Sequence, residues 1–370
     1  MNVPATSALP TVVIGAGPVG LAAAAHLLER DIEPLVLEAG PHAGAAVREW
    51  AHVRLFSPWS EVVDPAAEKL LAPTGWVRPD GDTYPSGGDW AEHYLQPLAD
   101  ALGGRVRYGA RVTGVSRSGR DRVVDADRDA QPFTVHLRTA DGGEERLIAR
   151  AVVDASGTWS TPNPLGGDGV PALGEEAAAD RIASRVPDLK DPAVRARYAG
   201  KRTAVVGSGA SAFTALAYLA ELADEAPGTH AVWILRRGIG TGTFGGGEAD
   251  ELPARGALGL RAKAAVDAGH ATAVTGFRTA AVERDAAGRL LLEGEDGRRL
   301  EPVDEVITLT GFRPDLSFLS EAPPRPGRTP PGTPRAGTAD RPERPFLRHG
   351  LPARRQGASP TPRRTCTWSA

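Results

Sequence analysis

The chain has 370 residues, which is enough for two domains of ordinary size. The formal net charge is −3, yet residues 322–370 hold ten arginines and two acids, so the remaining chain is acidic, which argues against a nucleic-acid-binding surface. The single cysteine, Cys366, excludes a disulfide framework, a CxxC redox pair and a cysteine-based metal site.

The first predicted elements are a strand, a glycine turn and a helix. Residues 12–14 are apolar and β-branched, as suits a strand buried on both faces, and residues 21–30 are rich in alanine and leucine. Between them, Gly15, Gly17 and Gly20 fall at GxGxxG spacing. In that motif the glycines permit a tight turn, the approach of a pyrophosphate and close packing of the helix, so we predict a dinucleotide site.

The next predicted strand, residues 35–37, ends at an acid. Glu38 lies eighteen positions after Gly20. A carboxylate there can accept both ribose hydroxyls of an adenosine and repels a 2′-phosphate. The site therefore suits a cofactor with a free 2′-hydroxyl, such as FAD; the alternative is a glycine-rich turn of another α/β fold, with Glu38 a coincidence.

A loop over residues 39–59 follows, rich in Gly, Pro, Trp and Arg. In one interpretation it wraps the diphosphate and ring of a flavin, and in the other it is a surface loop held by its aromatic side chains, Trp50, Phe56 and Trp59. Arg54 is the only candidate catalytic residue, because a guanidinium beside a flavin stabilises negative charge. The competing interpretation of Arg54 is an ordinary surface arginine.

Residues 84–102 predict a loop that leads into a helix capped by Asp89. A β-meander inserted in the first nucleotide domain is predicted from three stretches: residues 105–115, 133–138 and 146–148. The chain then returns to the sheet over residues 151–154. Gly157 and Thr158 follow, where small residues let the chain cross beside the cofactor.

A second strand-turn-helix motif begins at residue 201. Gly207, Gly209 and Ala212 give GxGxxA spacing, with Ser211 in the same turn. This turn predicts a second dinucleotide site.

The strand over residues 231–235 ends in Arg236 and Arg237, without an acid. Guanidinium groups at this point clamp a 2′-phosphate, so the second site suits NADPH; the alternative is a pair of solvated charges. Further strands are expected over residues 280–292 and 299–310. Thr310 and Gly311 then echo Gly157 and Thr158 as a strand-to-turn transition.

The order of these motifs resembles the flavoproteins with paired dinucleotide-binding domains, and is most similar to the class B flavin monooxygenases. The resemblance spans residues 10–320 and rests on GAGPVG, LEAG, DASGTWSTPNP, VVGSGASA, LRR and LTGFRPD. It implies FAD on the first domain, NADPH on the second, hydride transfer to flavin N5 and, in monooxygenases, an oxygen adduct at flavin C4a. The implied partners are molecular oxygen and a small-molecule substrate.

The chain departs from that family in its linker. The signature FxGxxxHxxxW/Y is absent between Pro164 and Lys201, where Gly167-Asp168-Gly169 stands without the histidine and aromatic residue. A flavin enzyme that passes electrons to another small acceptor therefore remains open. Dithiol reductase relatives are excluded, because no cysteine precedes Cys366.

Residues 322–370 have a composition of their own, with eleven prolines and ten arginines. Such a stretch has too little apolar surface to offset its ordering entropy, so we expect it to be disordered. It is either a natural basic tail or the product of a frameshift near Ala322 that truncates the fold. In the second case a nucleotide-binding protein without turnover is a further hypothesis.

The sequence thus predicts an α/β fold with two Rossmann-like dinucleotide-binding domains, the second inserted in the first. The expected FAD domain covers residues 1–160 and 300–321, the NADPH domain 161–299, and the tail 322–370. No His, Asp or Glu spacing suggests a metal site. No leader pattern and no run of about 20 apolar residues is found, so we expect no membrane contact and a cytoplasmic protein; the oligomeric state is not predicted.

Overall fold

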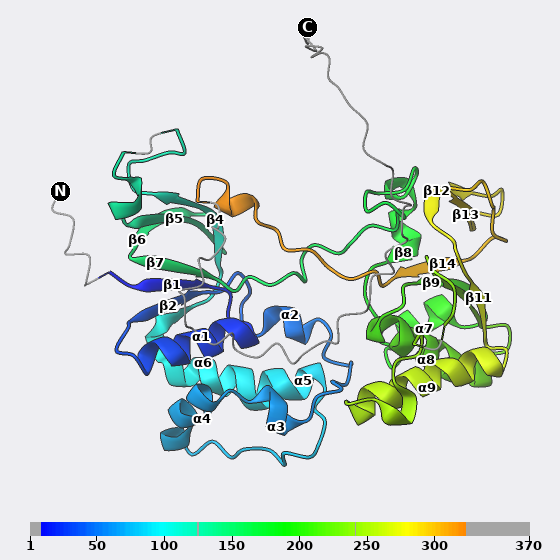
Figure 1. Ribbon diagram of the computed structural model, residues 1–370, viewed down its shortest axis with the longest axis horizontal. Helices are drawn as coiled ribbons and strands as arrows, with labels where there is room; N and C mark the ends of the chain where they lie inside the picture. The colour runs from blue at the N-terminus through cyan, green and yellow to red at the C-terminus, as the bar shows by residue number, and fades with distance from the viewer. Residues whose placement is uncertain (1–8, 124–125, 241, 323–370) are drawn as a thin grey trace, which may run out of the picture. The chain divides into compact units, whose positions relative to one another are not determined.

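The computed structural model describes residues 9–123, 126–240 and 242–322 (Figure 1). The predictions for the tail concern residues 323–370 almost entirely, and these lie outside the described residues. The helices are α1 (Pro18–Leu28), α2 (Ala45–Arg48), α3 (Trp59–Val62), α4 (Pro65–Leu71), α5 (Gly87–Trp90), α6 (Gln96–Leu102), α7 (Pro192–Tyr198), α8 (Ala210–Glu225) and α9 (Pro253–Asp267). A π-helical turn, Ala91–Leu95, joins α5 to α6. Short 3-10 turns lie at Ala72–Thr74, Gly103–Arg105, Arg128–Ala130, Glu176–Arg181, Gly247–Ala249 and Ser317–Leu319.

The strands form two parallel sheets and two antiparallel ones. The first parallel sheet has the order β3 (Val106–Arg107), β2 (Pro34–Leu37), β1 (Thr11–Ile14), β7 (Ala151–Asp154). The second has the order β11 (Ala271–Val274), β10 (His230–Ile234), β9 (Arg202–Val206), β14 (Glu305–Thr308), β8 (Ile182–Ala183). The antiparallel sheets are β4 (Ala110–Arg117), β5 (Phe133–Thr139), β6 (Glu144–Ala149) and the pair β12 (Thr279–Arg284), β13 (Leu290–Gly294). The predicted α/β fold class, with two Rossmann-like domains and a meander, is confirmed.

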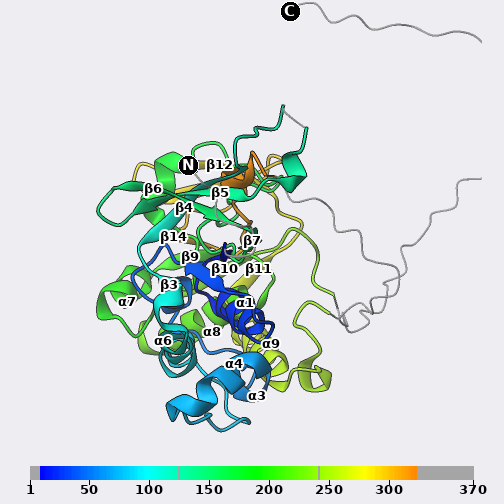
Figure 2. The same cartoon turned by 90° about the vertical axis from the view of Figure 1, so that its left-hand side faces the viewer.

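The first parallel sheet is covered on both faces. Val13 and Val36 face a core shared with α1, α4 and α6. Val12, Ile14 and Leu37 face the opposite way, onto the meander β4, β5 and β6, whose strands Figure 2 shows side by side. Successive side chains of a strand alternate between the two faces of the sheet, so a run of apolar residues suits a strand that is buried on both faces.

The second parallel sheet is built in the same three layers. Val205 and Trp233 face a core formed with α8 and α9. Val206 and Ile234 belong to the opposite face, which the hairpin of β12 and β13 covers. The glycine turns at the carboxyl ends of β1 and β9 therefore stand on equivalent, buried strands.

Several element bounds differ from the predictions. The helix after the first turn starts at Pro18. Proline is tolerated at the first position of a helix, because a backbone N–H there would have no acceptor within the helix. Ser86, and not Asp89, caps α5; the Asp89 carboxylate instead accepts the Ser86 N–H in a capping box. The expected strand 105–115 is divided between β3 and β4 in separate sheets. Sequence patterning also missed β11 and α9.

The expected domain boundary at 299/300 is too early. β14 pairs in parallel with β9 and so completes the second sheet. Only afterwards does the chain rejoin the first domain, where Leu319 packs among Val12 and Ile14. The insertion of one domain in the other is thus correct, but the return lies between Thr308 and Leu319.

Candidate nucleotide-binding sites

The first glycine turn lies between β1 and α1 and is closely packed. A Cβ on Gly20 would lie 2.0 Å from the Gly15 carbonyl oxygen, so only glycine fits there. At Gly17, by contrast, no atom lies within 4 Å of such a Cβ. The turn therefore leaves open space beside the second glycine, where the motif places a pyrophosphate. No side chain caps the N-terminus of α1, so its amides stay available to an anion.

Glu38 faces this turn. Its side chain is buried, and its carboxylate accepts the Ala16 N–H at 2.7 Å and the Gly40 N–H at 2.7 Å. Ala16 lies within the glycine turn, so the acid and the turn form one unit. The arrangement fits the predicted recognition of an adenosine ribose beside a diphosphate.

The second glycine turn lies between β9 and α8. A Cβ on Gly207 would lie 2.3 Å from the Leu309 carbonyl oxygen, while Gly209 again has open space around it. Ala212 is fully buried in the first turn of α8, whose N-terminus has no side-chain cap. The Trp233 indole N–H donates to the Gly207 carbonyl oxygen at 2.7 Å. Both turns thus have the cradle that a nucleotide diphosphate needs.

The strand ends beside the two turns are offset by one residue. The Gly15 N–H donates to the Leu37 carbonyl, and the Gly207 N–H donates to the Ile234 carbonyl. The structural equivalent of Glu38 is therefore Leu235, which is buried. The expectation that Arg236 and Arg237 stand at the equivalent of Glu38 is wrong, because they lie one and two positions beyond it.

Each turn abuts the chain that leaves the neighbouring strand. A Cβ on Gly15 would lie 2.7 Å from the Ala155 carbonyl oxygen, as Gly207 approaches Leu309 in the second domain. The exposed Gly157 and Thr158 follow shortly after Ala155. Thr310 and the exposed Gly311 follow Leu309 in the same way. The two predicted strand-to-turn exits are therefore placed alike.

Two of the predicted site residues meet at an apolar cavity of about 380 Å³. Arg54 is exposed there and donates to the Tyr84 carbonyl at 2.8 Å, and Ser211 reaches it from the second glycine turn. The remaining lining residues are Trp50, Val53, Leu55, Phe56, Ser57, Val62, Trp159, Arg185, Val186, Ala210, Thr214, Leu258, Leu309 and Phe312. Trp59 instead belongs to the core beside α4, as the surface-loop interpretation expects.

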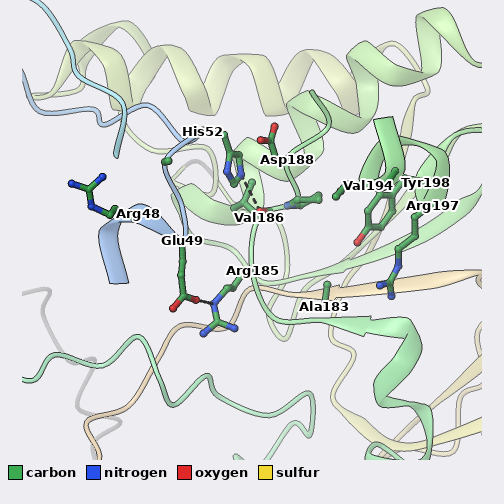
Figure 3. Close-up of a pocket in the computed structure, with 13 residues that line it drawn as sticks. Arg48, Glu49, His52, Ala183, Arg185, Val186, Asp188, Val194, Arg197 and Tyr198 are labelled. Atoms are coloured by element: carbon green, nitrogen blue, oxygen red, sulfur yellow. Dashed lines mark hydrogen bonds and ion pairs between the residues drawn. The ribbon is translucent and has the colours of Figure 1, made fainter. Parts of the chain in front are cut away.

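A larger cavity of about 600 Å³ adjoins it, and Arg185 and Val186 line both (Figure 3). None of the predicted site residues lines this larger cavity. The His52 ring lies 3.1 Å from the Val186 carbonyl, and Arg185 pairs with Glu49 at 3.6 Å. Burial raises the pKa of Tyr198, so its hydroxyl stays protonated and faces the cavity as a neutral group.

Arg236 and Arg237 are adjacent in the sequence but do not line the same cavity. Arg236 lines a small cavity of about 70 Å³ together with Thr310, whereas Arg237 is exposed and lines none of the cavities described above. The same small cavity holds Arg313, which sequence reasoning did not single out as a site residue. Arg185 and Trp159 were also missed, and only the quoted LTGFRPD stretch carried a signal for Arg313.

In residues 9–123, 126–240 and 242–322, no group of three or more His, Cys, Asp or Glu side chains could hold a metal ion. No helix of that part of the chain has the length and apolar character needed to cross a membrane.

Comparison with known proteins matches residues 12–326 to a family described as pyridine nucleotide-disulphide oxidoreductase. No curated protein matches the sequence at a significant level.

Solved structures with this fold include the bacillithiol disulfide reductase Bdr (YpdA) from Bacillus cereus, with a TM-score of 0.61, 22% identity, and 85% of this chain and 81% of that chain covered. They include DfoA from Erwinia amylovora, a cadaverine monooxygenase bound to FAD, with a TM-score of 0.60, 17% identity, and 84% and 80% covered. The ornithine hydroxylase PvdA from Pseudomonas aeruginosa has a TM-score of 0.57, 19% identity, and covers 85% of each chain. At these identities the likeness concerns the fold.

Proposed function

Because the chain belongs to the pyridine nucleotide-disulphide oxidoreductase family, we propose that it is an NADPH-dependent FAD enzyme of the monooxygenase type. The membership confirms the predicted class, an oxidoreductase that uses FAD and NADPH. The monooxygenase type, the small-molecule substrate and the use of molecular oxygen are our proposal. They are supported by DfoA and PvdA, which share the fold and are a monooxygenase and a hydroxylase.

The observation that carries the proposal is the pair of glycine turns, the first beside an acid at its strand end and the second without one. We assign FAD to the first turn, where Gly15, Gly17 and Gly20 would hold the diphosphate and Glu38 the adenosine ribose. Gly157 and Thr158 would lie beside it. When bound, FAD supplies the electron-transfer chemistry, so the protein has to supply binding, orientation and charge.

We assign NADPH to the second turn, where Gly207, Gly209, Ser211 and Ala212 would hold the diphosphate. Arg236 stands just past the strand end with no acid beside it, which favours a phosphorylated ribose over a free one. Thr310 and Gly311 follow Leu309, whose backbone lies against Gly207.

The apolar cavity of about 380 Å³ is our candidate for the reaction space, because it joins the loop of the first domain to the second glycine turn. Its walls are mostly apolar and aromatic, which excludes water and strengthens electrostatic interactions inside. Arg54 lies at this cavity and would stabilise negative charge that develops during reduction. We propose that a small substrate with an apolar body enters here.

A second candidate is a flavin reductase that passes electrons to another small acceptor. The missing linker signature between Pro164 and Lys201 favours it. Disulfide reduction through a protein dithiol needs two cysteines, and the chain has only Cys366. The third candidate is a nucleotide-binding protein without turnover.

One series of measurements separates the three. Purified full chain is titrated with FAD, and the visible absorbance of bound flavin is recorded before and after anaerobic NADPH. A protein without turnover shows no NADPH-dependent bleaching of these bands. An enzyme of the monooxygenase type is reoxidised quickly by oxygen, with oxygen consumed in proportion to NADPH, whereas a reductase transfers electrons to a quinone or ferricyanide much faster than to oxygen.

A further inference from the structure

A small cavity of about 70 Å³ lies at the carboxyl end of the second parallel sheet. Val206 ends β9, Arg236 follows β10, and Thr310 follows β14, and all three line this cavity. Ligands of open parallel sheets bind at this edge of the sheet. The cavity is therefore placed where part of a dinucleotide would lie.

Two arginines line this cavity. Arg236 comes from the end of β10 and Arg313 from the chain after β14. In the part of the chain that the structure describes, neither guanidinium forms an ion pair or a hydrogen bond, and no Asp or Glu lines the cavity. Two like charges around one small space repel each other, and an anion bound between them offsets this repulsion. A planar guanidinium pair favours a phosphate, which it can bind through paired N–H donors.

A glycine-rich loop, residues 166–169, also lines the cavity. It contains the Gly167-Asp168-Gly169 stretch noted in the sequence. The Glu175 carboxylate fixes the loop at both ends, by accepting the Leu165 N–H at 2.9 Å and the Ala172 N–H at 2.7 Å. Gly169 has a φ of +92°, and a Cβ there would lie 2.7 Å from an Arg313 guanidinium nitrogen. The glycine thus gives the Arg313 side chain room to lie against the loop.

Arg236 and Arg237 follow β10 closely, but only Arg236 lines the cavity. Val232 and Ile234 face the hairpin side of the sheet, where this cavity lies, and Trp233 and Leu235 face α8. Beyond β10 the chain bends at Arg236 and Arg237, and Arg236 lines the cavity together with Val206, which belongs to the hairpin side of the sheet. Arg237 does not line it.

We infer that Arg313 and Arg236, rather than Arg236 and Arg237, hold the 2′-phosphate of NADPH against the loop of residues 166–169. The inference rests on the proposed function, since it names the group that selects NADPH over NADH. Arg313 is then a specificity-determining residue supplied by the chain that leaves the second domain.

The test measures binding to the FAD-loaded full chain by calorimetry, with adenosine 2′,5′-bisphosphate, 5′-AMP and inorganic phosphate as probes. Arg313→Ala and Arg236→Ala should each weaken the bisphosphate by about 10- to 100-fold and leave 5′-AMP within about twofold, because only charge-assisted bonds to the 2′-phosphate are lost. Arg237→Ala is the matched control and should change neither probe by more than about twofold. Arg313→Lys, which keeps the charge without the planar fork, should recover part of the loss.

Three results would overturn the inference. Arg313→Ala could weaken 5′-AMP as much as the bisphosphate, which would make the arginine a support of the fold. Arg237→Ala could cause the loss instead, which would restore the adjacent pair. Inorganic phosphate could bind as tightly as the bisphosphate, which would make the cavity a site for free phosphate.

A wild-type protein that binds 5′-AMP and the bisphosphate equally would contradict both the inference and the proposed use of NADPH. Bleaching of the flavin bands by NADH in the same sample would then show that the rest of the proposed function stands. A clear preference for the bisphosphate that survives Arg313→Ala would contradict the inference alone.

Discussion

In the first glycine turn the inner face of the helix begins with Gly20, whereas the second turn has Ala212 at that position. A Cβ on Gly20 would lie 2.0 Å from the Gly15 carbonyl oxygen, whereas the second turn accommodates a real Cβ at the equivalent position, that of Ala212. The same sequence spacing therefore produces a crowded turn in one domain and a roomier one in the other.

The difference follows from what holds the first carbonyl of each turn. The Gly207 carbonyl accepts the Trp233 indole N–H at 2.7 Å, and the φ of Gly207 is +139°, against +99° for Gly15. Val36 stands at the register position of Trp233 in the first sheet and offers no donor. We infer that the tryptophan keeps the carbonyl away from the helix and so makes room for alanine.

The largest effect expected from breaking this comparison is that of Gly20→Ala. The added methyl must displace the Gly15 backbone, at a cost of about 3 kcal/mol of unfolding free energy, with loss of FAD binding. The reverse change in the second turn, Ala212→Gly, should cost only about 0.5–1 kcal/mol, the usual price of glycine in a helix. Chemical denaturation of both variants, with and without FAD, checks this, and equal costs would contradict it.

The next effect concerns the charge at the first strand end. Each carboxylate oxygen of Glu38 accepts one backbone N–H at 2.7 Å. Glu38→Gln keeps the shape of the side chain but replaces one of these oxygens by an NH2 donor and leaves the other as an uncharged amide oxygen. We expect a loss of about 1.5–3 kcal/mol in unfolding free energy, because a charge-assisted bond is broken inside the turn. FAD affinity should fall about tenfold.

The NADPH affinity of the Glu38→Gln protein is the internal control, since the equivalent position of the second turn is Leu235. Flavin fluorescence and nucleotide titration on one sample give both affinities. A parallel fall in the two would show that Glu38 serves the fold as a whole and not the first site.

The smallest effect is that of Trp233→Phe, which removes the indole N–H but keeps an aromatic ring. It should cost about 1 kcal/mol for one lost hydrogen bond. In the Ala212→Gly background the cost should be smaller, because the carbonyl then has space to turn toward the helix. A double-mutant cycle of unfolding free energies measures this coupling, and strictly additive costs would sink the explanation.

The sequence was sufficient for features that depend on local spacing. The two glycine turns, their flanking strands and the meander follow from glycine positions, period-two burial and turn residues, and they are present as predicted. The strand-end charges were also recognised, but their register was not. Glu38 and Arg236 differ by one position, because only the hydrogen bonds of Gly15 and Gly207 show which residues are equivalent.

The rest depends on contacts between residues far apart in the chain. Arg313 joins Arg236 in one cavity only because β14 pairs with β9, and this pairing also moves the domain boundary. The helix α9 was missed for another reason, because it begins within a glycine-rich stretch. Two of its own glycines, Gly256 and Gly259, are buried against the preceding segment, residues 244–250. Glycine there permits close packing, although its intrinsic preference argues against a helix.

Pro162 and Phe312 form an antiparallel bridge where the chain enters and leaves the second domain. Leu319, beyond this bridge, lies in the same core as Val12 and Ile14. During synthesis from the amino end, the described strands of the second sheet therefore emerge before Leu319, a core side chain of the first domain. The inserted domain can finish folding on the ribosome while the domain that began earlier is still incomplete.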